Sequence, residues 1–238
     1  MFEKLEKRLI LKGTIETLTP LHIGSGKSEM DIEEADMPVI KDVNDQPYIP
    51  GSTLKGKTRA EAERILRKEG YPVCNPPDVK SMCGSLASDP SKFCLACRIF
   101  GTAGKTYSVA SKVKFRDAYP LGKVEQLIQR SGIAIDRQTG TVSSRALYSI
   151  EAVPAGVAFG FEVVAENLTD EELRILCAAL RSVEHSAIGG GSSRGFGKVK
   201  INVDTVIERS AKYYLGAEGE KVYTGEALKK WFADKGCV

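Results

Sequence analysis

The chain has 238 residues, a formal net charge of +3 and 42% hydrophobic residues, enough for one sizeable core and compatible with a nucleic-acid partner. No stretch approaches the length and apolarity of a membrane span, which excludes a helical membrane protein. The first residues, MFEKLEKRLILKG, lack the apolar run of a signal peptide. We therefore expect a cytoplasmic protein without a membrane partner.

The first predicted element is a strand over residues 8–18. Leu9, Leu11 and Ile15 share one face of such a strand. A glycine-rich loop containing LHIGSG follows, and after it come short extended pieces that prolines interrupt.

A helix is expected next, with Ser52 or Thr53 as its cap. Its beginning, GSTLKGKT (51–58), satisfies the phosphate-cradling P-loop pattern. A P-loop needs a buried strand directly before it, and Pro47 and Pro50 interrupt such a strand. A P-loop nucleotide hydrolase is therefore the weaker alternative. The helix start and its basic side chains still favour phosphate, including that of an RNA backbone.

Four of the six cysteines lie close together, at Cys74, Cys83, Cys94 and Cys97. They occupy a proline-rich stretch, 70–98, that cannot build an apolar core of its own. Four thiolates complete a tetrahedral shell with no position left for water, so we expect a structural Zn²⁺ ion. Unrelated small buried residues and disulfides are the alternatives.

Residues 109–118 predict a strand with Val113 and Phe115 inward and with Lys112 and Lys114 outward. The next segment, 131–155, predicts a long excursion from the core with a hairpin turn at 138–140. VAFGFEVV then alternates strictly and predicts another strand. In the helix that follows, Thr169 and Glu172 form a capping box.

IGGGSSRGFG (188–197) contains too much glycine for regular structure. Such a chain can approach a ribose-phosphate closely and point N–H groups at it, although a flexible turn is the alternative. A strand at 197–203 and a terminal helix with Leu228, Trp231 and Phe232 complete the pattern. The order of elements predicts an α+β fold with helices on one face of an antiparallel sheet.

Six segments occur together and in order: LHIGSG (21–26), the stretch 35–59, RIFG (98–101), FRDA (115–118), IDRQTG (135–140) and IGGGSSRGFGKV (188–199). Together they resemble the repeat-associated mysterious protein (RAMP) superfamily. Within it, the chain is similar to the Cas-seven-type backbone subunits of type III (Csm-type) CRISPR effector complexes. The resemblance spans nearly the whole chain.

This resemblance implies one domain over 1–238, with a modified ferredoxin-like (RRM-like) core and insertions. The insertions would be the zinc-binding segment 70–98 and a protruding thumb hairpin at 131–155. The implied partners are CRISPR guide RNA, target single-stranded RNA, further copies of the chain and other type III effector subunits. Recognition of the RNA backbone would suit a protein that accepts any guide sequence.

The resemblance also implies cleavage of target RNA by a loop aspartate with Mg²⁺ or another divalent cation. Asp36 occupies the matching position, although Asp31, Glu33 and Glu34 crowd it. A carboxylate there can bind the cation or orient the attacking 2′-hydroxyl. The alternatives are a non-catalytic guide-RNA-binding subunit and a guide-processing endonuclease with His22 as general base.

The expected RNA-binding residues come from the two glycine-rich loops, the start of the first helix and the thumb. They are His22, Gly24, Ser25, Gly26, Ser52, Lys55, Lys57, Arg59, Arg137, Gly190, Gly191, Ser192, Ser193 and Arg194.

Overall fold

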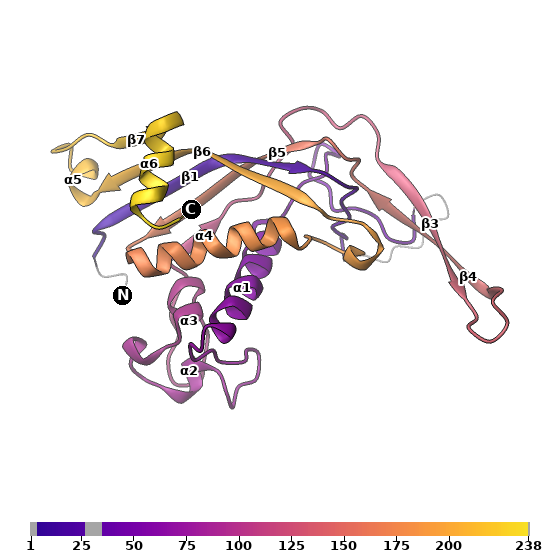
Figure 1. The fold of residues 1–238 in the computed structure, drawn as a ribbon, viewed down its shortest axis with the longest axis horizontal. Coiled ribbons are helices and arrows are strands. Elements are labelled where there is room, and N and C mark those ends of the chain that lie inside the picture. Colours follow the sequence, from indigo (N-terminus) through magenta and orange to yellow (C-terminus); the bar gives the residue numbers. More distant parts are fainter. Residues whose placement is uncertain (1–3, 27–34, 238) are drawn as a thin grey trace.

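The computed structural model describes residues 4–26 and 35–237 (Figure 1). Its strands are β1 (Lys7–Thr17), β2 (Val113–Phe115), β3 (Ile128–Ile135), β4 (Val142–Ala152), β5 (Ala158–Glu166), β6 (Val199–Ser210) and β7 (Lys221–Thr224). Its helices are α1 (Gly51–Lys68), α2 (Cys83–Leu86), α3 (Leu95–Phe100), α4 (Asp170–His185), α5 (Ala211–Tyr214) and α6 (Gly225–Asp234), with 3-10 turns at Pro90–Lys92 and Ser192–Arg194.

Five strands form the main sheet in the order β2-β5-β1-β6-β7, and every neighbouring pair is antiparallel. The chain therefore passes from β1 through α1 to β2, which lies on the far side of β5. It likewise passes from β5 through α4 to β6, which lies on the far side of β1. The expected mixture of helices and an antiparallel sheet is confirmed.

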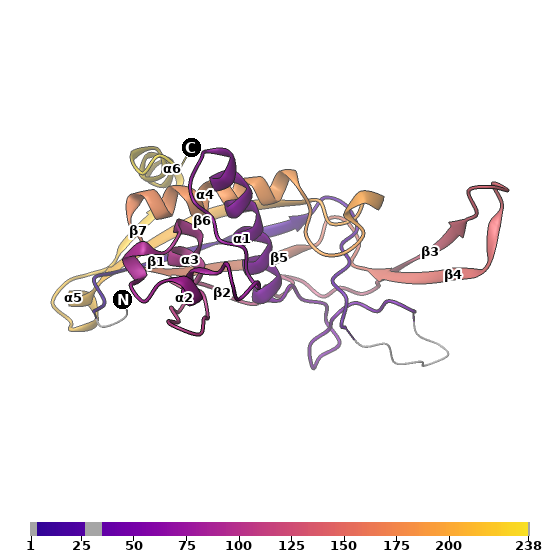
Figure 2. The ribbon, with the colours of Figure 1, turned by 90° about the horizontal axis from the view of Figure 1, so that it is seen from below.

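The core lies between the sheet and its helices. Alternation along β1 buries Leu11 and Ile15, which are fully inaccessible, and they share one apolar cluster with Leu173 and Leu176 of α4. Leu54 of α1 belongs to the same cluster, as do the expected anchors of α6. Figure 2 shows α1, α4 and α6 gathered beside the strands.

The opposite face of the sheet carries charges that pair across the strands. Glu166 on β5 contacts Arg8 at 2.6 Å and Lys114 at 3.0 Å. Glu162, four residues earlier on the same face of β5, contacts Lys12 at 3.6 Å. Arg8, Lys12 and Lys114 are therefore each matched by a carboxylate across the strands.

Lys112 corrects one expectation, because its side chain is buried rather than outward. Its Nζ lies 2.7 and 3.0 Å from the two carboxylate oxygens of Glu172. Glu172 also completes the capping box with Thr169, which confirms the predicted start of α4. Since β2 begins only at Val113, Lys112 lies outside the strand alternation and is free to reach the buried end of α4.

The excursion is a separate two-stranded sheet, β3–β4, that projects from one end of the molecule (Figures 1 and 2). Its turn is closed by a hydrogen bond from Gly140 N to Asp136 O, which confirms the expected hairpin. Ile133 and Leu147 stay largely exposed on it. Among the described residues, none of the helices combines the length and apolarity needed to cross a bilayer.

Candidate functional site

Asp36 lies at the base of the β3–β4 hairpin. Its carboxylate Oδ2 accepts hydrogen bonds from Ser149 N at 2.6 Å and from Ser149 Oγ at 3.0 Å. The neighbouring Met37 pairs with Ile150 as a short parallel bridge, so the segment runs alongside β4. This pairing holds the exposed carboxylate of Asp36 in a fixed position beside β4.

The bonds to Ser149 favour the ionised form of Asp36. The N–H of Ser149, followed by its hydroxyl, lowers the pKa of the Asp36 carboxyl below its usual range. A carboxylate with a depressed pKa is a weak proton acceptor at neutral pH, whereas its negative charge suits a divalent cation. Among the described residues no hydrogen-bond partner is found for Oδ1.

His22 joins the first glycine-rich loop to β4 and to the second such loop. Its Nδ1 lies 2.7 Å from the carbonyl of Glu151, which can only accept, so Nδ1 carries the proton. The carbonyl of His22 accepts a hydrogen bond from Gly190 N at 2.8 Å. His22 is half-buried. These contacts fix the orientation of the imidazole ring between the two loops. Nε2 lies on the side of the ring toward Gly24.

The second glycine-rich loop, 188–197, packs against the hairpin. Arg194 donates to the Tyr148 hydroxyl at 2.6 Å, and Phe196 lies under the guanidinium of Arg130. Gly189 has a φ of +74°, and a Cβ there would lie 2.2 Å from the carbonyl oxygen of His22. Only glycine permits this approach.

Four segments therefore meet in what we call the hairpin-base site: residues 20–26, 35–41, 148–153 and 188–197. Several of its members are exposed at this surface, namely Gly24, Gly26, Asp36, Gly189, Gly190, Ser192, Ser193 and Arg194. Ser25 and Gly191 are half-buried within the same two loops. These exposed members thus supply the carboxylate of Asp36, the guanidinium of Arg194, hydroxyls and accessible main chain.

The basic residues of α1 lie elsewhere. Lys57 pairs with Glu61 at 2.8 Å, and Arg59 pairs with Glu63 at 2.8 Å. Ser52 is exposed. Lys55 is half-buried, and burial, followed by the charge of Arg59, lowers its pKa.

The P-loop interpretation is wrong, because GSTLKGKT is helical from its first residue and no strand precedes it. The expected caps are also wrong. Pro50 occupies the cap position without a side-chain hydrogen bond, and the N–H of Gly51 donates to Asp117 Oδ1 at 2.7 Å. Gly51 belongs there because a Cβ would lie 2.3 Å from the carbonyl oxygen of Phe115.

Arg137 lies in the turn at the tip of the hairpin, remote from the hairpin-base site (Figure 1). Asp31, Glu33 and Glu34, the acidic neighbours of Asp36, fall outside the described residues.

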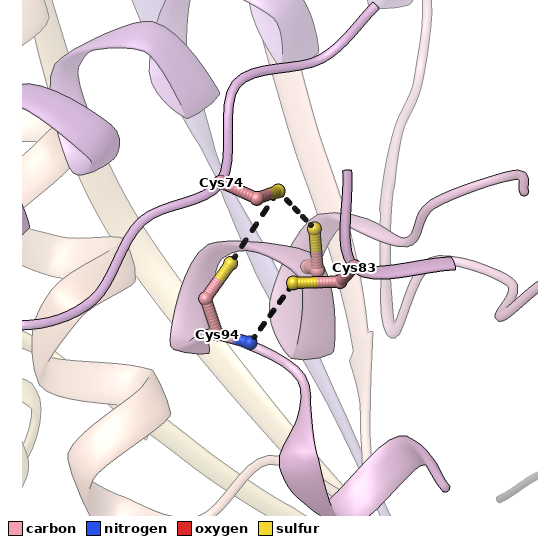
Figure 3. Close-up of side chains that lie close together, drawn as sticks. Cys74, Cys83 and Cys94 are labelled. Carbon is pink, nitrogen blue, oxygen red and sulfur yellow. Dashed lines mark hydrogen bonds between the residues drawn. The ribbon is translucent and has the colours of Figure 1, made fainter. Parts of the chain in front are cut away.

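The four clustered cysteines do come together. Their sulfur atoms all lie within 4.8 Å of one another. Cys74 Sγ is 3.3 Å from Cys97 Sγ and 3.8 Å from Cys94 Sγ. Figure 3 shows the side chains of Cys74, Cys83 and Cys94 directed at one another.

This spacing fits a tetrahedral zinc ion, for which bonds of about 2.3 Å place neighbouring sulfur atoms about 3.8 Å apart. The crowded thiols have unequal acidities. Burial raises the pKa of Cys83 to about 11, and a hydrogen bond from Cys97 lowers the pKa of Cys94 to about 4. The apolar side chains of Leu66, Phe93 and Leu95 pack around the buried Cys94 and Cys97, whereas Cys74 and Cys83 are half-buried.

Sequence reasoning missed Ser149, Tyr148, Glu151 and Arg130. None of them lies in a recognisable motif, and each acts through a partner that is distant in the chain. Only the pairing of β4 with the 35–41 segment and with β3 could have shown that they belong to the site.

A family model for the RAMP superfamily matches residues 14–200. A protein of Methanocaldococcus jannaschii named "CRISPR system Cms endoribonuclease Csm3" is 34% identical, over 93% of this chain and 90% of its own. The protein of the same name from Methanothermobacter thermautotrophicus is 31% identical, over 91% of this chain and 93% of its own.

Two solved structures share the fold. A chain of the Csm3–Csm4 subcomplex of the type III-A CRISPR-Cas interference complex superposes with a TM-score of 0.60 at 27% identity, over 99% of this chain and 98% of that one. Csm3 of Methanopyrus kandleri gives a TM-score of 0.60 at 24% identity, over 89% of this chain and 80% of its own.

Proposed function

The chain belongs to the RAMP superfamily, and we propose that it is a repeating backbone subunit of a type III CRISPR effector complex that binds guide RNA and cleaves target RNA. The names of its Csm3 relatives support the endoribonuclease activity. The structure of a Csm3–Csm4 subcomplex supports assembly with other effector subunits. Copies of the chain would stand side by side along one guide RNA, in the cytoplasm.

We assign the core to the ferredoxin-like class. Its elements β1, α1, β2, β5, α4 and β6 follow the β-α-β-β-α-β order, and the strand order β2-β5-β1-β6 supports this assignment. The β3–β4 hairpin, inserted between β2 and β5, would be the thumb that separates neighbouring stretches of guide RNA. Residues 70–98 would be the second insertion.

The hairpin-base site would hold the RNA. Exposed main-chain N–H groups of 188–197, together with Arg194 and the hydroxyls of Ser192 and Ser193, suit phosphate and ribose oxygens. None of these groups depends on the identity of a base, so the site can serve any guide, and base pairing supplies the sequence specificity. Lys55 and Lys57 on α1 and Arg137 at the thumb tip would contribute further charge.

Asp36 would serve cleavage. The single observation that carries this proposal is the pairing of Asp36 with Ser149, which holds an ionised carboxylate on the exposed base of the hairpin. The ribose 2′-hydroxyl would attack the adjacent phosphorus, and the 5′ oxygen of the next nucleotide would leave. Oδ1 of Asp36 would bind Mg²⁺ or another divalent cation, which would stabilise the developing negative charge.

The test is the complex assembled on guide RNA with Asp36→Asn, which preserves size and removes the charge. We expect target binding to persist and cleavage to stop. Asp45→Asn is the matched control, because Asp45 is an exposed carboxylate in the same stretch between β1 and α1. Unchanged cleavage with Asp36→Asn would leave a non-catalytic guide-RNA-binding subunit as the function.

We also propose that Cys74, Cys83, Cys94 and Cys97 hold a structural Zn²⁺ ion. The sulfur spacing supports this proposal, as does the position of the cluster in a segment with little apolar core of its own. None of the six cysteines is in a disulfide, which fits a reducing compartment such as the cytoplasm.

A further inference from the structure

Arg59 was expected to bind RNA, but its guanidinium is turned into the protein. Nε donates to Glu63 Oε1 at 2.8 Å, Nη1 donates to the carbonyl of Gly101 at 2.9 Å, and Nη2 donates to Cys97 Sγ at 3.5 Å. All three nitrogen atoms therefore have partners inside the molecule. The side chain is only 21% exposed.

The two contacts beyond Glu63 lie within α3 and directly after it, and Cys94, the other member of the last cysteine pair, is the residue before this short helix. Cys97 lies in α3, and Gly101 follows the end of the helix with a φ of +80°. A Cβ at Gly101 would lie 2.7 Å from Ser111 N, so the chain is tightly packed there. The planar fork of Arg59 thus holds both the sulfur and the loop that follows it in one orientation.

The contact between Arg59 and Cys97 Sγ would compensate negative charge at the metal centre. Four thiolates around a divalent ion leave two negative charges in excess, and Cys94 and Cys97 hold their sulfur atoms in buried positions. An N–H donor from a cation stabilises such a sulfur, because it compensates charge without removing a ligand. Arg59 is the side-chain cation seen within hydrogen-bonding distance of a cluster sulfur among the described residues.

Arg67, two turns further along α1, offers a natural comparison. It pairs with the same carboxylate, Glu63, at 3.5 Å, and it reaches the backbone oxygen of Cys74 at 3.5 Å. It therefore shares with Arg59 the helix, the residue type and the ion-pair partner. It differs in contacting a carbonyl oxygen instead of a sulfur.

We propose that Arg59 is a positioning residue of the metal centre, which donates a charge-assisted hydrogen bond to the Cys97 thiolate and ties the metal-bearing segment to α1. This inference rests on the proposed zinc site. It extends that proposal from the four ligands to the group that balances their charge, and it assigns Arg59 to metal retention.

The test compares the full-length wild-type chain with Arg59→Gln, Arg59→Lys and the control Arg67→Gln. Zinc affinity is measured by competition with a chromogenic chelator. We expect Arg59→Gln to weaken zinc binding by about 10- to 100-fold, the usual effect of losing a hydrogen bond to a ligand. Arg59→Lys, which keeps the charge but not the fork, should fall between wild type and Arg59→Gln. Arg67→Gln should stay near wild type.

Replacing zinc with cobalt(II) gives a second measurement, the wavelength of the thiolate-to-cobalt charge-transfer band, which does not depend on the stability of the fold. A hydrogen bond lowers the energy of the sulfur lone pairs, so its loss should shift the thiolate-to-cobalt charge-transfer band to longer wavelength in Arg59→Gln only. Equal affinity and an unshifted band in Arg59→Gln would overturn the inference. Equal losses in Arg59→Gln and Arg67→Gln without a band shift would also overturn it. A wild-type chain that binds neither metal would instead refute the zinc site itself.

Discussion

Asp36 and Ser149 are joined twice across 113 positions of sequence, since the carboxylate of Asp36 accepts from the N–H and from the hydroxyl of Ser149. The contact lies where the hairpin leaves the body of the protein. It gives the exposed carboxylate of Asp36 a fixed direction and a lowered pKa. The proposed chemistry of the site depends on this relationship.

Ser149→Ala should therefore reduce target cleavage and leave target binding intact. The backbone N–H would still hold Asp36, but the hydroxyl would no longer fix its orientation, and a displaced catalytic group can cost up to about 100-fold in rate. Single-turnover cleavage in the assembled complex measures the effect. Ser131→Ala is the control, because Ser131 faces Ser149 across the hairpin and is exposed. Equal rates in both variants would contradict the positioning role.

Gly189→Ala should weaken both folding and RNA binding, because the new Cβ would lie 2.2 Å from the His22 carbonyl. Gly195→Ala is the matched control, since Gly195 also has a positive φ but open space around it. The control should lose about 1 kcal/mol of stability through backbone strain alone. Gly189→Ala should lose more, and its RNA affinity should fall roughly tenfold, equivalent to about 1.4 kcal/mol. Denaturant unfolding and salt-controlled RNA titration measure the two effects, and matching behaviour of the two variants would refute the close-approach argument.

Removing the metal should loosen residues 70–98 and spare the main sheet. Cys97→Ser, or treatment with a strong chelator, should abolish zinc retention, since a three-thiolate shell is open and the segment has little core of its own. Zinc content by elemental analysis and the rate of tryptic cleavage within 70–98 are the measurements. Cys177→Ser is the control, because Cys177 lies on α4 away from the cluster. Full zinc content in Cys97→Ser would exclude a four-cysteine site.

Acid should destabilise the protein in part through Glu166. Burial opposes ionisation of this carboxyl, but hydrogen bonds from Lys114 and Arg8 outweigh it, so the folded-state pKa is lowered. Its stabilisation is therefore complete above the unfolded-state pKa of about 4.3 and is lost as pH falls through the folded-state value. Glu166→Gln should lower the free energy of unfolding by about 1 to 2 kcal/mol at pH 7 and flatten its decline in acid.

Urea unfolding between neutral and acidic pH tests this prediction. Glu162→Gln is the control on the same face, because its ion pairs are longer, at 3.6 Å, and more exposed. If wild type and Glu166→Gln declined in parallel with falling pH, Glu166 would not contribute to acid sensitivity.

Local signals accounted for much of the fold. Thr169 and Glu172 predicted the start of α4 because a capping box is complete within four residues. The turn near Gly140 and the alternation along β1 were equally local. Lys112 was misread because its buried partner, Glu172, lies 60 positions away, and strand alternation says nothing about a residue just outside a strand.

By itself, the sequence determined the long strands, the two long helices and the hairpin turn, and that four thiols lay in one short segment, whereas the short elements α2, α3, α5 and β7 were not predicted. Hydrophobic periodicity, caps and glycine content act within a few residues, so they can be read directly from the chain. The tertiary structure alone decided that Asp36 meets Ser149 and that Arg59 meets Cys97. Those contacts arise from strand pairing and helix packing between distant segments, and pairing energies of that kind leave no local mark on either partner.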